Sequence, residues 1–165
     1  MKHIAFQRTF RLMLVMLFIS IAAPAQKPGY TKYKCMVQMT NYAGEAAYIV
    51  VSLMNPSGAY EKTLYMMGPD KKWYDHFKAW HKFNTKKPAN LNGITGASVA
   101  GGDRSVTNFE IEDAKVDAGY KLRFESAVED KKYYESDIEI ELTKENLSKK
   151  TEGSNYIRYV RFSSN

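Results

Sequence analysis

The sequence is short of cysteine and histidine, and these shortages exclude several kinds of site. It has one cysteine, Cys35, which cannot form a disulfide within the chain, so packing must hold the fold together. It has three histidines, and only His76 and His81 lie beyond the first 25 residues. These two are five positions apart and fall on different faces of the helix predicted there. We therefore predict no metal site.

Long apolar runs are also lacking, and the one at the N-terminus is short. Residues 12–22 fall below the roughly 20 residues that cross a bilayer as a helix. Basic residues precede the run, and Ala23-Pro24-Ala25 follows it with the small-residue pattern of a cleavage site. The pattern predicts a cleavable signal peptide over residues 1–25. The mature chain is then periplasmic or secreted, and it does not span a membrane.

An excess of charge is lacking as well once the signal peptide is removed. Residues 1–25 contain Lys2, Arg8 and Arg11 and no acidic residue, so their loss lowers the formal charge from +6 to +3. This small excess favours solubility over nucleic-acid binding, and export argues against nucleic acid as a partner. Residues 26–165 are enough for one ordinary core, so we predict a single domain over this range.

The apolar period of the mature chain is mostly two, which is the period of β-strands. Seven segments show it: residues 32–41, 46–54, 59–66, 106–112, 120–128, 136–142 and 156–162. Asn55-Pro56-Ser57-Gly58 has the residues of a type I turn, which predicts a hairpin between the second and third segments. Cys35 alternates with polar neighbours, and we interpret it as a small buried residue rather than a nucleophile. The pattern predicts an all-β sandwich of about seven strands.

Residues 71–82 have the period of a helix instead, and Asp70 stands where a helix cap is expected. Trp73, Phe77 and Trp80 fall on one stripe of the helix, at spacings of four and three, with lysines on the opposite face. Such a stripe is more often the buried face of a helix than an exposed one, so we interpret the segment as one short inserted helix or a pair of turns. The alternative is an exposed binding surface formed by Trp73, Tyr74 and Trp80 for a partner or a sugar.

The sixth predicted strand has an acidic face. Its apolar residues Ile138, Ile140 and Leu142 alternate with Asp137, Glu139 and Glu141. We expect the three carboxylates to lie on the outer, solvated face, where alternate acidic residues can also bind a hard cation such as Ca²⁺.

Residues 83–102 show no apolar period and predict a long loop, whose second half contains glycines at positions 93, 96, 101 and 102. Residues 92–98, Asn-Gly-Ile-Thr-Gly-Ala-Ser, resemble the D-x-x-[S/T]-G-A-[S/T] pattern on which a bacterial extracytoplasmic FMN transferase attaches FMN through a phosphoester. The resemblance implies that Ser98 carries the FMN and that Thr95 fills the first hydroxyl position. It also implies that Gly96 and Ala97 are the small neighbours that a transferase requires. Asn92 stands where the pattern has aspartate.

A wider resemblance covers most of residues 33–143. Residues 46–64, the aromatic segment with Trp73 and Trp80, residues 93–98 and residues 116–125 together resemble the periplasmic domain-of-unknown-function family numbered 2271. The resemblance implies an immunoglobulin-like β-sandwich, similar to the domains of flagellar hook-capping proteins. It also implies occurrence beside membrane redox and metal-uptake proteins.

Two functions follow as hypotheses, and in neither does the chain act as an enzyme with catalytic residues of its own. The favoured one is a non-enzymatic accessory or interaction module that binds a periplasmic or outer-membrane partner. The alternative is an extracytoplasmic redox carrier with covalent FMN on Ser98, in which Trp73, Tyr74 or Trp80 shields the flavin ring. Its partners would be periplasmic or membrane redox or uptake proteins and an FMN transferase.

Overall fold

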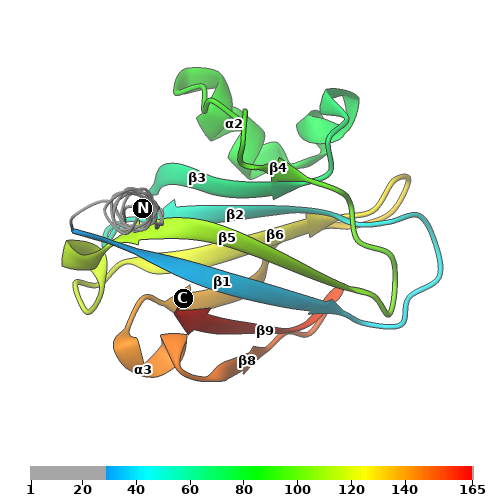
Figure 1. Cartoon of the computed structure of the whole chain (residues 1–165). Coiled ribbons are helices and arrows are strands. Elements are labelled where there is room, and N and C mark those ends of the chain that lie inside the picture. The colour runs from blue at the N-terminus through cyan, green and yellow to red at the C-terminus, as the bar shows by residue number, and fades with distance from the viewer. Residues whose placement is uncertain (1–28, 165) are drawn as a thin grey trace, which may run out of the picture.

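The computed structural model describes residues 29–164, and the predicted signal peptide lies outside the described residues. Two β-sheets pack face to face, and two short helical segments cover the outer face of one of them (Figure 1). The predicted all-β sandwich is therefore confirmed. Within residues 29–164, no helix is long and apolar enough to span a membrane.

The first sheet has the strand order β5-β1-β9-β8. Its strands are β1 (Tyr30–Met39), β5 (Arg104–Glu112), β8 (Lys150–Glu152) and β9 (Ile157–Ser164). All neighbours in it are antiparallel. Cys35 of β1 is fully buried against the other sheet, as predicted, and burial raises the pKa of its thiol. The thiol is thus a packing group and not a nucleophile.

The second sheet has the order β4-β3-β2-β6-β7. Its strands are β2 (Tyr48–Met54), β3 (Tyr60–Met67), β4 (Thr95–Gly96), β6 (Lys121–Ala127) and β7 (Tyr133–Glu141). The predicted hairpin joins β2 and β3, where the N–H of Gly58 donates to the carbonyl of Asn55 at 2.9 Å. Strands β4 and β8 were not predicted, because two and three residues are too few to show a period.

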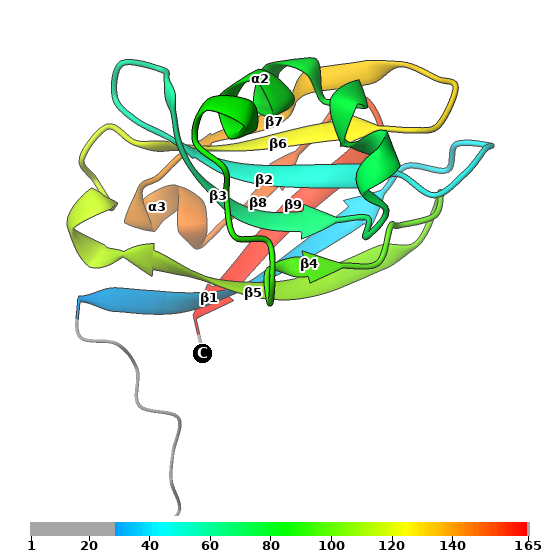
Figure 2. The ribbon, with the colours of Figure 1, turned by 90° about the horizontal axis from the view of Figure 1, so that it is seen from above.

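A helical layer lies on the outer face of the second sheet (Figure 2). It consists of the 3₁₀ helix η1 (Lys71–His76) and the helix α2 (Lys78–Lys86), which meet at Phe77. Asp70 caps η1 as predicted, since its side chain accepts the N–H of Lys72 at 3.1 Å. Tyr74, Phe77 and Trp80 pack with Val50, Met66 and Ala127 of the sheet and form a second core. Two further short helices, η2 (Asp113–Lys115) and α3 (Lys144–Leu147), lie in connections between strands.

The acidic face predicted on the sixth strand is wrong at Asp137. Its side chain is buried, and its Oδ2 accepts hydrogen bonds from the Ser126 hydroxyl (2.5 Å) and the N–H of Ile157 (3.0 Å). The cause is a shift in the pairing of β6 with β7 between Phe124 and Ser126. The shift turns Asp137 inward, where it links β6 and β7 to β9 of the other sheet.

Candidate functional site

The glycine-rich run is held against the edge of the second sheet for much of its length. Strand β4 pairs in parallel with the end of β3, and the N–H of Gly68 donates to the carbonyl of Gly96 at 2.8 Å. Beyond it, Val99 and Ala47 exchange two backbone hydrogen bonds of 2.8 and 2.9 Å. The long free loop predicted over residues 83–102 is therefore wrong in part. Ala97 and Ser98 form a short span between two fixed backbone points.

Ser98 is the second residue of this span. It is half-buried and follows the exposed Ala97. Within residues 29–164, no side chain or backbone group makes a hydrogen bond to the Ser98 hydroxyl. Its position is fixed by the backbone contacts on either side, and its oxygen is not engaged by a neighbour. Such a hydroxyl is available to react in the active site of another protein.

The glycine of the T-G-A-S run has a packing role of its own. A Cβ at Gly96 would lie 2.5 Å from the hydroxyl oxygen of Tyr65, so the Tyr65 side chain would have to shift to admit it. At Gly101 the obstacle is backbone, because a Cβ there would lie 2.2 Å from the backbone oxygen of Tyr42. Packing thus favours glycine at position 96 and requires it at position 101, whether or not Ser98 is modified.

Asn92 and Thr95, the first two residues of the flavin-attachment pattern, lie beside a hollow. The Thr95 hydroxyl donates to the carbonyl of Leu91 at 2.9 Å, and the exposed Asn92 donates its backbone N–H to Oδ1 of Asn90 at 3.1 Å. The hollow, of about 590 Å³, is called the amide hollow below. It is lined by Pro69, Lys71, Tyr74, Asn84, Ala89, Asn90, Leu91, Asn92, Gly93 and Thr95. Two of the five residues of the flavin pattern, Asn92 and Thr95, therefore line one cavity.

Two of the three residues of the predicted binding surface, Tyr74 and Trp80, are buried, whereas Trp73 is half-buried. Trp80 is fully buried, and its indole N–H donates to the Thr63 hydroxyl at 2.9 Å. Tyr74 is 7% exposed and donates its hydroxyl to the carbonyl of Gly68 at 3.2 Å. Trp73 alone of the three is half-buried, with the Lys72 ammonium 4.9 Å from its ring centroid. The interpretation of the stripe as a buried face is confirmed for Phe77 and Trp80, which lie in the second core together with Tyr74, and not for the half-buried Trp73.

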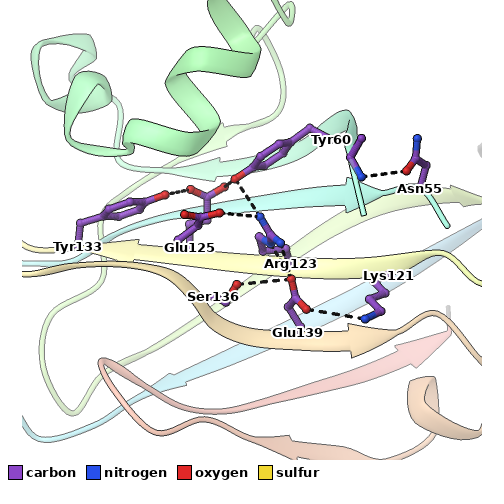
Figure 3. Close-up of polar contacts among 10 residues, drawn as sticks. Asn55, Tyr60, Lys121, Arg123, Glu125, Tyr133, Ser136 and Glu139 are labelled. Carbon is purple, nitrogen blue, oxygen red and sulfur yellow. Dashed lines mark hydrogen bonds and ion pairs between the residues drawn. The ribbon is translucent and has the colours of Figure 1, made fainter. Parts of the chain in front are cut away.

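A buried acid that the sequence did not indicate lies under α2. Glu125 of β6 is fully buried and accepts hydrogen bonds from the hydroxyls of Tyr60 (2.7 Å) and Tyr133 (2.5 Å), as Figure 3 shows. Arg123 donates to the Tyr60 hydroxyl at 3.3 Å and forms ion pairs with Glu135 and Glu139. We call these four residues, Glu125, Tyr60, Tyr133 and Arg123, the acid–tyrosine cluster.

Burial raises the pKa of Glu125 to about 7, because removing the carboxylate from water disfavours its charge. The same cluster holds the helical layer in place. Phe83 of α2 stacks on Tyr60 with ring centroids 5.3 Å apart, and Phe77 meets Tyr133 edge to face at 5.7 Å. The sequence predicts the helix but not its position above β6. Without a layer above the sheet, Glu125 would face solvent.

Within residues 29–164, no strand pairs with the outer edge of β3 before Met66, where the pairing with β4 begins. Two adjoining hollows of about 480 and 340 Å³ lie there, and both are lined by Lys62, Thr63 and Ala89. The larger one also reaches Phe109 of β5, so it lies where the edges of the two sheets approach each other. An uncovered strand edge beside a hollow is a place where an extended segment of another chain can pair.

Among residues 29–164, no group of three or more His, Cys, Asp or Glu side chains is placed to hold a metal ion. In comparison with known proteins, the model of a family described as predicted periplasmic protein (DUF2271) matches residues 30–159. No curated protein and no solved structure matches the chain. The likeness to immunoglobulin-like domains of hook-capping proteins therefore stays a prediction.

Proposed function

The chain belongs to the DUF2271 family of predicted periplasmic proteins, and we propose that it is a non-enzymatic accessory protein that carries FMN covalently on Ser98. One observation carries the proposal. In a run that resembles the flavin-attachment pattern, Ser98 lies between two fixed backbone points, with a small exposed neighbour and no competing partner for its hydroxyl within residues 29–164. The burial of Trp80 and Tyr74 weakens the alternative in which those aromatics bind a partner, and it equally weakens the expectation that these two residues shield the flavin ring.

Attachment forms a bond between the Ser98 Oγ and the phosphorus of FMN. The donor is a flavin dinucleotide, whose phosphoanhydride bond breaks, and the hydroxyl proton passes to the released mononucleotide. The transferase must supply the base, because no histidine or carboxylate contacts the Ser98 hydroxyl within residues 29–164. When bound, the flavin supplies electron transfer, while the chain supplies its position and surroundings.

The residues present fit this group with one departure. Ala97 is exposed, and Gly96 adds no side chain beside the hydroxyl. Asn92 replaces the aspartate of the pattern, and its side chain is exposed, so the fold does not depend on its identity. The departure therefore affects recognition by the transferase and not the folding of the site.

Co-expression with an FMN transferase tests the proposal. The purified protein should gain the mass of one FMN minus water and keep its yellow colour after denaturation. Ser98→Ala should remove the added mass, and Ser154→Ala, at an exposed serine in a turn outside the pattern, should keep it. An unmodified wild-type mass under these conditions would overturn the proposal.

A second candidate function is an interaction module that works without flavin. The uncovered edge of β3 and its two hollows support it, because they leave room for an extended segment of a periplasmic partner. A photo-crosslinking residue at Lys62 should capture one defined envelope protein, whereas the same residue at Lys150, exposed on β8, should not. Equal capture from both positions would count against this function.

A further inference from the structure

The amide hollow is lined by side chains that carry hydrogen-bond donors. Oδ1 of Asn84 accepts the N–H of Ala89 at 2.9 Å, and Oδ1 of Asn90 accepts the N–H of Asn92 at 3.1 Å. Because a backbone N–H can only donate, these bonds identify the oxygen of each side chain. Each Nδ2 amide is then left with no hydrogen-bond partner within residues 29–164. Lys71 adds an ammonium group to the same wall.

A ligand of this hollow must therefore bring acceptors. The isoalloxazine ring does so, since its pyrimidine edge has two carbonyl oxygens and becomes negatively charged on reduction. The volume of about 590 Å³ lies in the range of cavities that hold small molecules. Tyr74, although only 7% exposed, is among the lining residues and offers a small aromatic contact to a flat ring.

The hollow is also within reach of the attachment point. Thr95 lines it, and Ser98 follows three residues later along the chain. Three extended residues span at most about 10 Å. An extended ribityl phosphate has a similar length, so a flavin linked at Ser98 can place its ring beside Thr95.

We infer that the amide hollow seats the isoalloxazine ring of the flavin on Ser98, with the Nδ2 amides of Asn84 and Asn90 donating to its carbonyl oxygens. This inference rests on the proposed function. In this arrangement η1, α2 and residues 90–95 bind the ring, and Ser98 only tethers it. The outer surface of the helical layer then contacts the flavin, while the buried aromatic face of the layer packs on the sheet.

Isosteric variants of the flavinylated protein test the inference. Asn84→Asp and Asn90→Asp each keep an oxygen that accepts the backbone N–H, and they remove the Nδ2 donor. Asn55→Asp is the matched control, because Oδ1 of Asn55 likewise accepts backbone N–H groups, from Ser57 and Ala59, in the hairpin turn far along the chain. Two spectra report on the ring: the circular dichroism of its visible bands and its fluorescence.

We expect the same added mass in all four proteins, with strong visible dichroism and quenched fluorescence in wild type and Asn55→Asp. In Asn84→Asp and Asn90→Asp the ratio of seated to released ring should fall by at least about threefold to tenfold, because each variant loses one hydrogen bond and places a carboxylate opposite a carbonyl oxygen of the ring. A flavin that is attached but has the spectra of free FMN in every protein would overturn the inference and leave the attachment standing. Absence of the added mass would overturn the proposed function instead.

Discussion

The hydroxyl of Tyr65 occupies the space that a side chain at Gly96 would need, 2.5 Å from the position of its Cβ. The glycine in the flavin-type pattern is therefore held by packing, independently of any modification. Gly96→Ala should lower the free energy of unfolding by about 1–3 kcal/mol, the usual cost of overpacking. Urea unfolding measures this.

Tyr65→Phe provides the control for this prediction, because it removes the atom nearest the added methyl group. The double variant should recover part of the loss, so that the two substitutions are not additive. Additive losses would show that Tyr65 is not the obstacle.

Glu125 should make the stability of the protein depend on pH. Burial raises its pKa from 4.5 to about 7, so the folded state favours the neutral acid. The stability that Glu125 contributes is then fully present below about pH 4.5 and is lost as the pH rises through 7. The loss should reach about 3 kcal/mol above that pH.

Glu125→Gln tests this, because a glutamine stays neutral at every pH and its oxygen still accepts a tyrosine hydroxyl. The difference in unfolding free energy between wild type and variant should shift in favour of the variant between pH 4.5 and 7. Parallel pH profiles would show that Glu125 does not titrate in this range. Thermal or urea unfolding at several pH values gives both curves.

Asp137 should contribute more to the free energy of unfolding than an acidic residue on a solvated strand face. Asp137→Ala leaves the N–H groups of Tyr156 and Ile157 without their acceptor and should cost about 2–4 kcal/mol. Glu141→Ala, on the exposed face of the same strand, should stay within about 0.5 kcal/mol of wild type. Similar urea midpoints for the two variants would contradict the role assigned to Asp137.

Asn92 should limit the efficiency of flavin attachment. Asn92→Asp restores the carboxylate of the pattern at an exposed position, so the rate of FMN addition should rise while the unfolding free energy stays the same. The measurement is a time course of intact mass with transferase and flavin dinucleotide. An unchanged or slower rate would show that the transferase does not need the carboxylate here.

The sequence predicted the sandwich well because strand alternation is a local property. Cys35, the Asn55–Gly58 turn and the Asp70 cap all depend on neighbours within a few residues, and the structure confirms each. Asp137 could not be placed, because its burial follows from a shift in the pairing of β6 with β7 that no local pattern reveals.

Dependence on distant segments also explains why the burial of residues around the site could not be predicted from the sequence. Glu125 looks like a residue of an exposed strand face until α2 is placed above it, and Trp80 and Tyr74 become unavailable by the same packing. The amide hollow depends on segments that are brought together only by the fold. By contrast, the resemblance to the attachment pattern is continuous in sequence, so Ser98 could be proposed from the sequence.

Mapping the modified residue tests the central claim most directly. Protein co-expressed with an FMN transferase should give, after proteolysis and tandem mass spectrometry, one peptide that carries FMN minus water with the added mass on Ser98. A peptide containing residues 95–99 recovered only in unmodified form, or the added mass on another hydroxyl, would contradict the account.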